Sequence, residues 1–240
     1  MTTRIDTRVV ARHCAAFASS ALCALAALPA QASPYNFQFD GYHTAPPQSV
    51  SFASSTPAVS GTFNAGASNF TATDLAAPFT VESLIAYCVE ITQPLGSIVN
   101  NYVPVALSAS GLSAAQQTAI GQLYSHGTNY AGSLVAAGAS AAFQLALWEI
   151  VNETSGSFDL ANGSFRDLTG GTIGATAAGM LSTLAATAID PNLQFTIWSS
   201  PTHQNFLQVT TRSTHVPEPS TLALLGMGLA AAALRRRRNG

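Results

Sequence analysis

The chain has 240 residues, of which 48% are hydrophobic and only 8% are charged, and its formal net charge is −2. Residues 33–215 contain nine acidic side chains but only two basic ones, Arg166 and Arg212, and the whole chain contains no lysine. Nucleic-acid binding needs a basic surface. The composition therefore excludes nucleic acid as an expected partner.

The first 32 residues have the layout of a secretory signal peptide. Arg4, Arg8 and Arg12 form a basic region, an apolar run follows over residues 14–28, and Ala30-Gln31-Ala32 has the form of a cleavage site. We expect export and cleavage after this last motif. The alternative is an N-terminal membrane anchor.

The body, residues 33–215, is long enough for one domain with its own core. Short alternating runs such as Phe37–Phe39 and Val59–Phe63 predict strands with many turns in its first part. Residues 79–91 also alternate and predict a strand that ends near Thr92. In that strand Tyr87 lies on one face, and Cys88 and Glu90 lie on the other.

Helical patterns follow in the middle of the body. Ser113 and Gln116 form a capping-box pattern that predicts a helix to about His126. Ser140 is placed to cap a second helix over residues 141–152, and residues 175–187 predict an alanine-rich third. Strand patterns return at 193–198 and 206–211. Strands, then helices, then strands predict an α+β domain.

The C-terminal segment, residues 216–240, has three parts. Pro217, Glu218 and Pro219 precede an apolar run over residues 221–234, and the arginines Arg235, Arg236, Arg237 and Arg238 follow it. A helix of this length reaches about 21 Å, which is less than the ~30 Å hydrocarbon core of a bilayer. We therefore interpret the apolar helix as a sorting handle. The alternative is an ordinary C-terminal anchor, with the arginines on the cytoplasmic side in either case.

These three parts together resemble the PEP-CTERM sorting signal of Gram-negative bacteria. In that family an exosortase, a membrane-embedded cysteine peptidase-transferase, recognises the Pro-Glu-Pro motif, the apolar helix and the arginines. The resemblance implies exosortase as a partner during sorting and transient or permanent membrane attachment through the C-terminal helix. It also implies a location at the cell surface or in the extracellular matrix, where exopolysaccharide is a further expected partner.

Two residues of the body call for an explanation. Removal of the signal peptide takes away Cys14 and Cys23, so Cys88 is a lone thiol in an exported protein and cannot form an intramolecular disulfide. Gln144 shares a helical stripe with large apolar residues, including Trp148, and a buried amide needs hydrogen-bond partners.

A thiol that attacks a glutamine side-chain carbonyl and expels ammonia leaves a thioester. Such a bond needs an apolar shelter, which Tyr87 and Trp148 would supply, and a group for proton transfer, for which Glu90 and His126 are candidates. One bond of this kind would account for both the lone thiol and the buried amide.

The segments Y-C-V-E, residues 87–90, and F-Q-L-A-L-W-E-I, residues 143–150, are similar to the paired motifs of bacterial thioester domains. Those domains are surface adhesin modules with a Cys-Gln thioester, and Phe143 stands where the family often has Thr. The resemblance implies that Cys88 and Gln144 form the bond, that Trp148 packs beside it, and that the strands are β-sandwich-like with a helical insertion. It implies covalent adhesion to an amine-bearing target rather than enzymatic turnover, without a cofactor.

Two alternatives remain open. In the first, the protein is a non-reactive structural component of an exopolysaccharide or biofilm matrix, with Cys88 a core residue and Gln144 an ordinary amide. In the second, Cys88 forms a Cys-His hydrolase dyad with His126, or with His43 or His203. A strand is an unusual place for such a cysteine, because a helix N-terminus lowers the thiol pKa. The histidines lack metal-ligand spacing, so we expect no metal.

Overall fold

The computed structural model describes residues 34–44, 46–77, 80–126 and 136–212. The expected signal peptide and the expected sorting segment, with Pro217, Glu218, Pro219 and Arg235–Arg238, lie outside these residues. The strands and helices are β1 Tyr35–Tyr42, β2 Gln48–Ser55, β3 Ala58–Ala65, β4 Ser68–Asp74, β5 Val81–Cys88, β6 Ile98–Ala106, η2 Leu107–Ala109, α1 Ala114–Ser125, α2 Ala137–Asn152, β7 Phe165–Asp167, α3 Gly171–Ser182, η3 Leu184–Ala186, β8 Leu193–Ser199 and β9 Phe206–Thr211.

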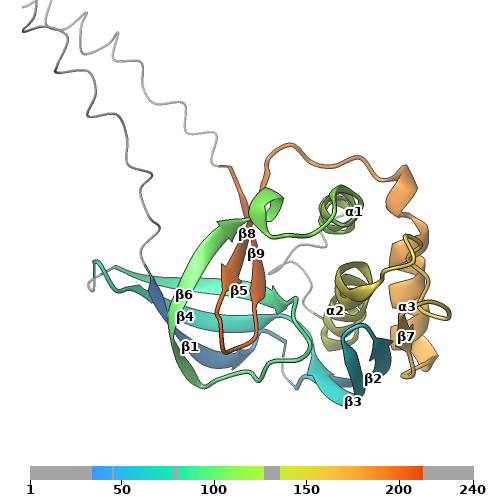
Figure 1. Ribbon diagram of the computed structural model, residues 1–240, viewed down its shortest axis with the longest axis horizontal. Helices are drawn as coiled ribbons and strands as arrows, with labels where there is room; N and C mark the ends of the chain where they lie inside the picture. The colour runs from blue at the N-terminus through green and yellow to red at the C-terminus, as the bar shows by residue number, and fades with distance from the viewer. Residues whose placement is uncertain (1–33, 45, 78–79, 127–135, 213–240) are drawn as a thin grey trace, which may run out of the picture. The chain divides into compact units, whose positions relative to one another are not determined.

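Six strands form a closed barrel in the order β1-β4-β5-β9-β8-β6, with antiparallel neighbours throughout (Figure 1). Aromatic rings from strands that are not neighbours meet inside it. The ring of Phe37 lies 5.0 Å from that of Trp198, and the ring of Phe70 lies 4.4 Å from that of Phe206. These contacts fill the barrel with side chains, so that it is a packed core rather than a channel.

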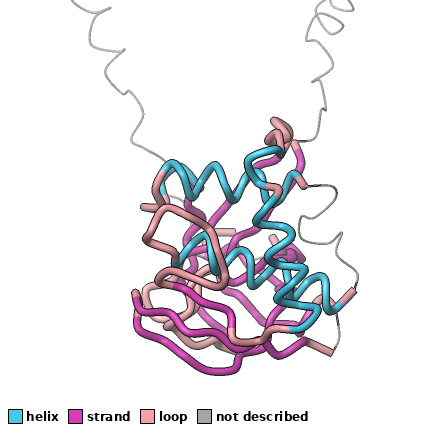
Figure 2. The backbone as a smooth tube through the Cα atoms, turned by 90° about the vertical axis from the view of Figure 1, so that its right-hand side faces the viewer, coloured by secondary structure: helices cyan, strands magenta, loops and turns pink. Residues whose placement is uncertain are grey.

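The hydrophobic core continues around α2, which lies beside the barrel among α1, α3 and the small sheet β3-β2-β7 (Figures 1 and 2). Phe143 of α2 packs 4.6 Å from Tyr87 of the barrel and 4.7 Å from Tyr124 of α1, measured between ring centroids. Trp148 of the same helix packs 5.2 Å from Phe52 of the small sheet. From Ser140 to Asn152 nearly every residue of α2 is buried, as expected of a helix that is apolar all round.

The predicted α+β class is confirmed, with strands at both ends of the body and helices between them. The β-sandwich-like arrangement was wrong, because the strands close into a barrel instead of two facing sheets. The physical reason is the pairing of the last hairpin. Strand β9 pairs with β5 and strand β8 pairs with β6, so the hairpin joins what would otherwise be two open edges.

The predicted bounds of individual helices and strands agree with the structure to different degrees. The capping box of Ser113 and Gln116 is present at the start of α1. Helix α2 begins four residues before the predicted start, so Ser140 lies inside the helix rather than capping it. Helix α3 also begins and ends earlier than predicted. Strand β5 ends at Cys88 rather than near Thr92.

Ser140 has a different role from the predicted cap. Its hydroxyl accepts the backbone N–H of Ala67 at 2.9 Å and lies 3.1 Å from the hydroxyl of Tyr87. Ser140 is fully buried, so these contacts tie the first turn of α2 to the barrel in a place without solvent.

We predict that Ser140→Ala lowers the free energy of unfolding by about 1–3 kcal/mol, because it leaves the buried N–H of Ala67 without its acceptor. Urea unfolding measures this loss. The matched control is Ser182→Ala on the exposed end of α3, which should change stability by less than about 0.5 kcal/mol. Equal effects of the two substitutions would contradict the proposed tie.

Candidate functional site

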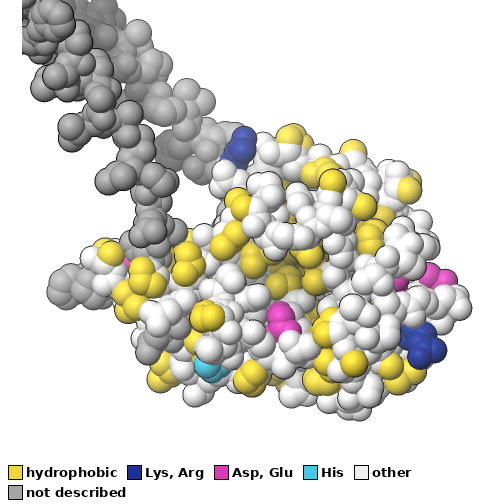
Figure 3. All heavy atoms as spheres, viewed as in Figure 1, with side chains coloured by type: hydrophobic (Ala, Val, Ile, Leu, Met, Phe, Trp, Pro, Cys, Tyr) yellow, Lys and Arg dark blue, Asp and Glu magenta, His cyan; other side chains and the backbone are white. Residues whose placement is uncertain are grey.

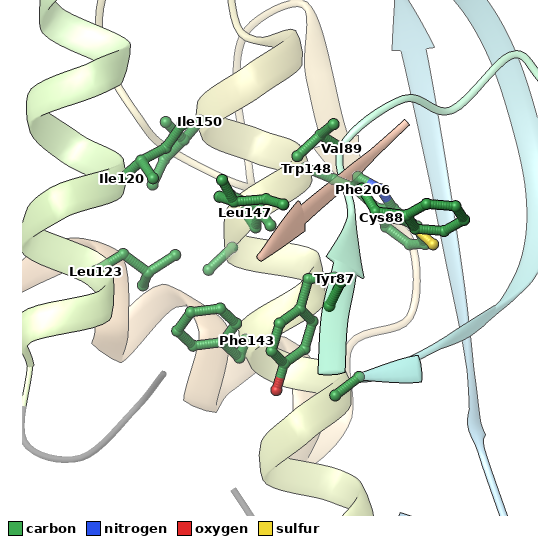
Figure 4. Packing of buried hydrophobic residues seen from close by; sticks show 14 of the residues in the cluster. Tyr87, Cys88, Val89, Ile120, Leu123, Phe143, Leu147, Trp148, Ile150 and Phe206 are labelled. Carbon is green, nitrogen blue, oxygen red and sulfur yellow. The ribbon is translucent and has the colours of Figure 1, made fainter. Parts of the chain in front are cut away.

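Cys88 is the last residue of β5, and alternation along the strand separates it from its neighbour Tyr87. Tyr87 points toward Phe143 of α2, whereas the sulfur of Cys88 points away from Phe143 (Figure 4). Cys88 is 8% exposed. The side chain is therefore nearly enclosed but retains a narrow opening to the surface.

The structure brings Gln144 to Cys88. The backbone N–H of Cys88 donates to Oε1 of Gln144 at 3.0 Å, and Nε2 of Gln144 donates to the backbone oxygen of Cys88 at 2.6 Å. Gln144 is fully buried. The carboxamide is thus held in one orientation against the residue that carries the thiol, and both its polar atoms have partners.

A second carboxamide, which the sequence patterns did not indicate, faces the sulfur itself. Sγ of Cys88 donates to Oε1 of Gln204 at 3.2 Å, and Nε2 of Gln204 donates to the backbone oxygen of Glu90 at 2.7 Å. Gln204 lies in the turn between β8 and β9, where no periodic pattern marks it. Only the barrel closure, which places this turn beside the end of β5, brings it to the site.

Cys88 and Gln204 line a cleft with a volume of about 490 Å³. Its walls combine aromatic and aliphatic side chains with uncharged polar ones, and no acidic, lysine or arginine residue is among them. The lining residues are Tyr42, Phe52, Thr62, Phe63, Asn64, Cys88, Ile91, Thr92, Gln93, Pro94, Leu95, Trp148 and Gln204. The cleft can therefore accept an uncharged or apolar group next to Cys88. Among the described residues the indole N–H of Trp148 is buried and has no hydrogen-bond partner.

The thiol of Cys88 is not a ready nucleophile by itself. Its pKa is raised to about 12: burial is the main cause and the nearby charge of Glu90 adds to it, whereas a backbone hydrogen bond opposes the shift. The thiol is therefore protonated near neutral pH. Catalytic cysteines have the opposite perturbation, a lowered pKa.

The predicted proton-transfer groups bond elsewhere. The carboxylate of Glu90 accepts the N–H of Thr92 and, at 2.7 Å, the N–H of Gln93, so it stabilises the turn that follows β5. His126 lies at the end of α1, with Nδ1 3.4 Å from the hydroxyl of Thr183.

The other histidine candidates are also occupied away from the thiol. Nδ1 of His43 lies 2.9 Å from Oδ1 of Asn69, and Nδ1 of His203 lies 2.9 Å from the hydroxyl of Thr202. None of the three described histidines lines the cleft at Cys88. Over residues 34–44, 46–77, 80–126 and 136–212 there is also no cluster of three His, Cys, Asp or Glu side chains that could hold a metal ion.

Two buried glutamates at the C-terminal end of α2, Glu149 and Glu153, have pKa values shifted in opposite directions. Oε1 of Glu149 accepts the N–H of Asp159, but burial outweighs this bond and raises the pKa of Glu149 to about 8. Burial alone would raise the pKa of Glu153 as well. Hydrogen bonds from Ser155, Phe165 and Ser164 outweigh it and hold the pKa of Glu153 at about 2.

Residues 215–238 match the PEP-CTERM protein-sorting motif. The chain thus carries this motif, which implies that the protein is exported and that exosortase processes it. The matched segment includes Pro217, Glu218, Pro219 and the four arginines.

Among solved structures, the chain is similar to the N-terminal thioester domain of a surface protein from Clostridium perfringens, determined as a cysteine-to-alanine mutant. The TM-score is 0.36 at 14% sequence identity, over 60% of this chain and 88% of that one. No curated protein matches the chain in sequence. Within the described residues, no helix has the length and apolar character needed to span a membrane.

We predict that Glu149→Gln flattens the pH dependence of stability above pH 4.5, the ordinary pKa of a glutamate. Between 4.5 and about 8 the folded protein keeps a proton on Glu149 that the unfolded chain has lost, so the free energy of unfolding falls as pH rises. Urea unfolding at several pH values measures the slope.

The control, Glu153→Gln, should act at the other end of the scale. The lowered pKa of Glu153 stabilises the fold above pH 4.5, and this stabilisation is lost as pH falls toward 2. A wild-type slope in the Glu149→Gln variant would contradict the assignment of Glu149 as a buried neutral acid.

Proposed function

We propose that this exported protein is a covalent surface adhesion module, in which Cys88 and Gln144 form an internal thioester that an amine on a target opens. The observation that carries the proposal is the carboxamide of Gln144, fixed by two hydrogen bonds on the main chain of Cys88. Both hydrogen bonds are buried, and they hold the side-chain carbonyl of Gln144 against the residue that carries the lone thiol.

The contacts favour bond formation at this carbonyl. Attack by sulfur on Cδ of Gln144 puts negative charge on Oε1, and the N–H of Cys88 already donates to that oxygen. A fixed donor of this kind stabilises the developing oxyanion. The C–N bond then breaks, and the thiol proton leaves with the nitrogen as ammonia, so no external reagent is needed.

In the proposed adhesion step, an amine of the target opens the thioester, which is the reverse of its formation with ammonia replaced by that amine. The amine nitrogen bonds to Cδ of Gln144, the C–S bond breaks, and one amine proton passes to sulfur. Each molecule reacts once, which is why we propose a binding module and not an enzyme. Since the chain contains no lysine, no side-chain amine of its own competes for the bond.

The PEP-CTERM motif supports placement of this module outside the cytoplasm. We propose the cell surface or the extracellular matrix as its location, with a C-terminal membrane anchor that is transient or permanent. The target carries an amine, and exopolysaccharide is a candidate partner of the mature protein.

A second candidate function is supported by the same contacts. Both polar atoms of the Gln144 carboxamide have hydrogen-bond partners, and so does the thiol of Cys88. These groups satisfy one another without any covalent bond. A non-reactive structural protein of a biofilm matrix would therefore also be stable with these residues.

Intact mass decides between the two candidates. We predict that the purified exported protein is lighter than its sequence by one ammonia, and that methylamine replaces this deficit by one bound methylamine. Cys88→Ala and Gln144→Ala should show no deficit after correction for the substitution. Gln93→Ala, at the wall of the same cleft, is the matched control and should behave as wild type.

A wild-type mass equal to the sequence mass, with Cys88 alkylated only after unfolding, would overturn the thioester. The structural matrix protein would then be the better description. A wild-type deficit that survives in Gln144→Ala would instead show that another side chain is the acyl partner.

A further inference from the structure

Three elements build one wall of the cleft at Cys88 from aromatic rings. The ring of Phe52 on β2 stacks 4.7 Å from that of Phe63 on β3 and lies 5.2 Å from that of Trp148 on α2, measured between ring centroids. All three residues line the cleft together with Cys88. Phe52 and Trp148 are buried, whereas Phe63 is only partly buried, so its ring is the most accessible of the three.

Uncharged polar side chains complete the lining of the cleft. Thr62, Asn64 and Thr92 belong to it and are exposed. Their hydroxyl and amide groups both donate and accept hydrogen bonds but carry no charge. A cleft of about 490 Å³ with such walls suits a compact neutral group that has one apolar face and a polar edge.

Among the described residues that line the cleft, none is a base suited to neutral pH. The lining contains no acidic residue and no histidine. Its two titratable residues, Tyr42 and Cys88, both have a raised pKa, mainly because of burial. An amine opens a thioester with its nitrogen lone pair, so an ammonium ion must first lose a proton. The cleft supplies no group to take that proton, and the amine must therefore arrive neutral.

This requirement discriminates between amines by their basicity. The pKa of a lysine side chain is ~10.4, so near pH 7 on the order of one in 10³ lysine amines is neutral. Oxygen atoms on the neighbouring carbons withdraw electron density from the amine of an amino sugar. Its pKa is consequently nearer to the ~8 of a peptide α-amino group than to that of lysine.

We propose that the cleft at Cys88 selects an amino sugar with a free amine, whose pyranose ring packs on Phe63 and places the weakly basic nitrogen at the thioester. This inference rests on the proposed function and names the chemical class of its target. A pyranose ring presents C–H groups on its face and hydroxyls around its edge. It thus matches both the aromatic wall and the uncharged polar side chains.

The test compares four amines with the full exported protein and follows each adduct by intact mass at pH 7 and pH 9. Methyl glucosaminide provides the sugar amine in a closed ring. Glycinamide is a weakly basic amine without a ring, the amide of Nα-acetyl-lysine is a strongly basic one, and methylamine is the small reference. The variant Phe63→Leu keeps an apolar side chain but removes the aromatic face. Its matched control is Ser60→Ala, an exposed residue of the same strand that does not line the cleft.

We expect the glucosaminide adduct to form at least about tenfold faster than the lysine adduct at pH 7, and this advantage to shrink at pH 9 as more lysine becomes neutral. The glucosaminide adduct should also form about tenfold faster than the glycinamide adduct, and Phe63→Leu should remove most of this second advantage. Ser60→Ala should keep it. Each comparison is a ratio within one protein, so a general loss of stability, measured by urea unfolding, does not imitate the result.

A separate measurement does not depend on the thioester. Cys88→Ala cannot form the bond, and we expect saturation-transfer NMR to show contact between this variant and the ring protons of methyl glucosaminide. The contact should be lost in the double variant Cys88→Ala, Phe63→Leu. Its absence in Cys88→Ala would overturn the sugar subsite.

The remaining outcomes separate the inference from its basis. A lysine adduct that forms as fast as the glucosaminide adduct at pH 7 would overturn the selection by basicity while the thioester stands. Equal rates for glucosaminide and glycinamide, unaffected by Phe63→Leu, would overturn the sugar and favour a protein N-terminus as the target. Absence of any ammonia deficit in wild type would overturn the proposed function, and the NMR measurement would still decide whether the cleft binds a sugar.

Discussion

The pair of hydrogen bonds between the Gln144 carboxamide and the main chain of Cys88 joins the helical half of the body to the barrel. All four polar groups are buried, so the loss of one partner would leave another unsatisfied at a cost of about 1–3 kcal/mol. Ser140, one turn earlier in α2, makes a similar connection to Ala67 and Tyr87. With these two connections the register of α2 against the barrel is set. Trp148, one turn later, is thereby placed at the wall of the cleft.

In this protein, hydrogen bonds between uncharged amide, hydroxyl and backbone groups make the connections between elements that ion pairs make in many other proteins. Only 8% of the chain is charged, and few charged side chains appear on the face drawn in Figure 3. The cleft at Cys88 continues this pattern, because its polar lining consists of uncharged groups. An ammonium ion would gain no carboxylate partner there. The environment therefore favours the neutral form of an amine, which is also the nucleophilic form that the proposed reaction requires.

The sequence predicted those features whose cause is local and failed where distant segments meet. The capping box at Ser113 and the bounds of β9 depend on a few adjacent residues, and both were predicted correctly. The burial of Gln144 followed from helical spacing. Barrel closure depends on which strands the last hairpin joins, and no short pattern specifies that. Gln204, 116 residues from Cys88, could not be predicted for the same reason. The partners of Ser140, Ala67 and Tyr87, are likewise distant in sequence, so a local capping pattern could not identify them.

Glu90 shows how a residue can serve the site without touching the reacting atoms. Its carboxylate binds the N–H groups of the turn after β5, and this turn carries the wall of the cleft from Thr92 to Leu95. Its backbone oxygen orients the carboxamide of Gln204, which in turn faces the sulfur. The thiol of Cys88 hydrogen-bonds the side chain of Gln204, whereas the side chain of Gln144 hydrogen-bonds the main chain of Cys88. Both side chains are carboxamides, so each brings a carbonyl group to the residue that carries the thiol.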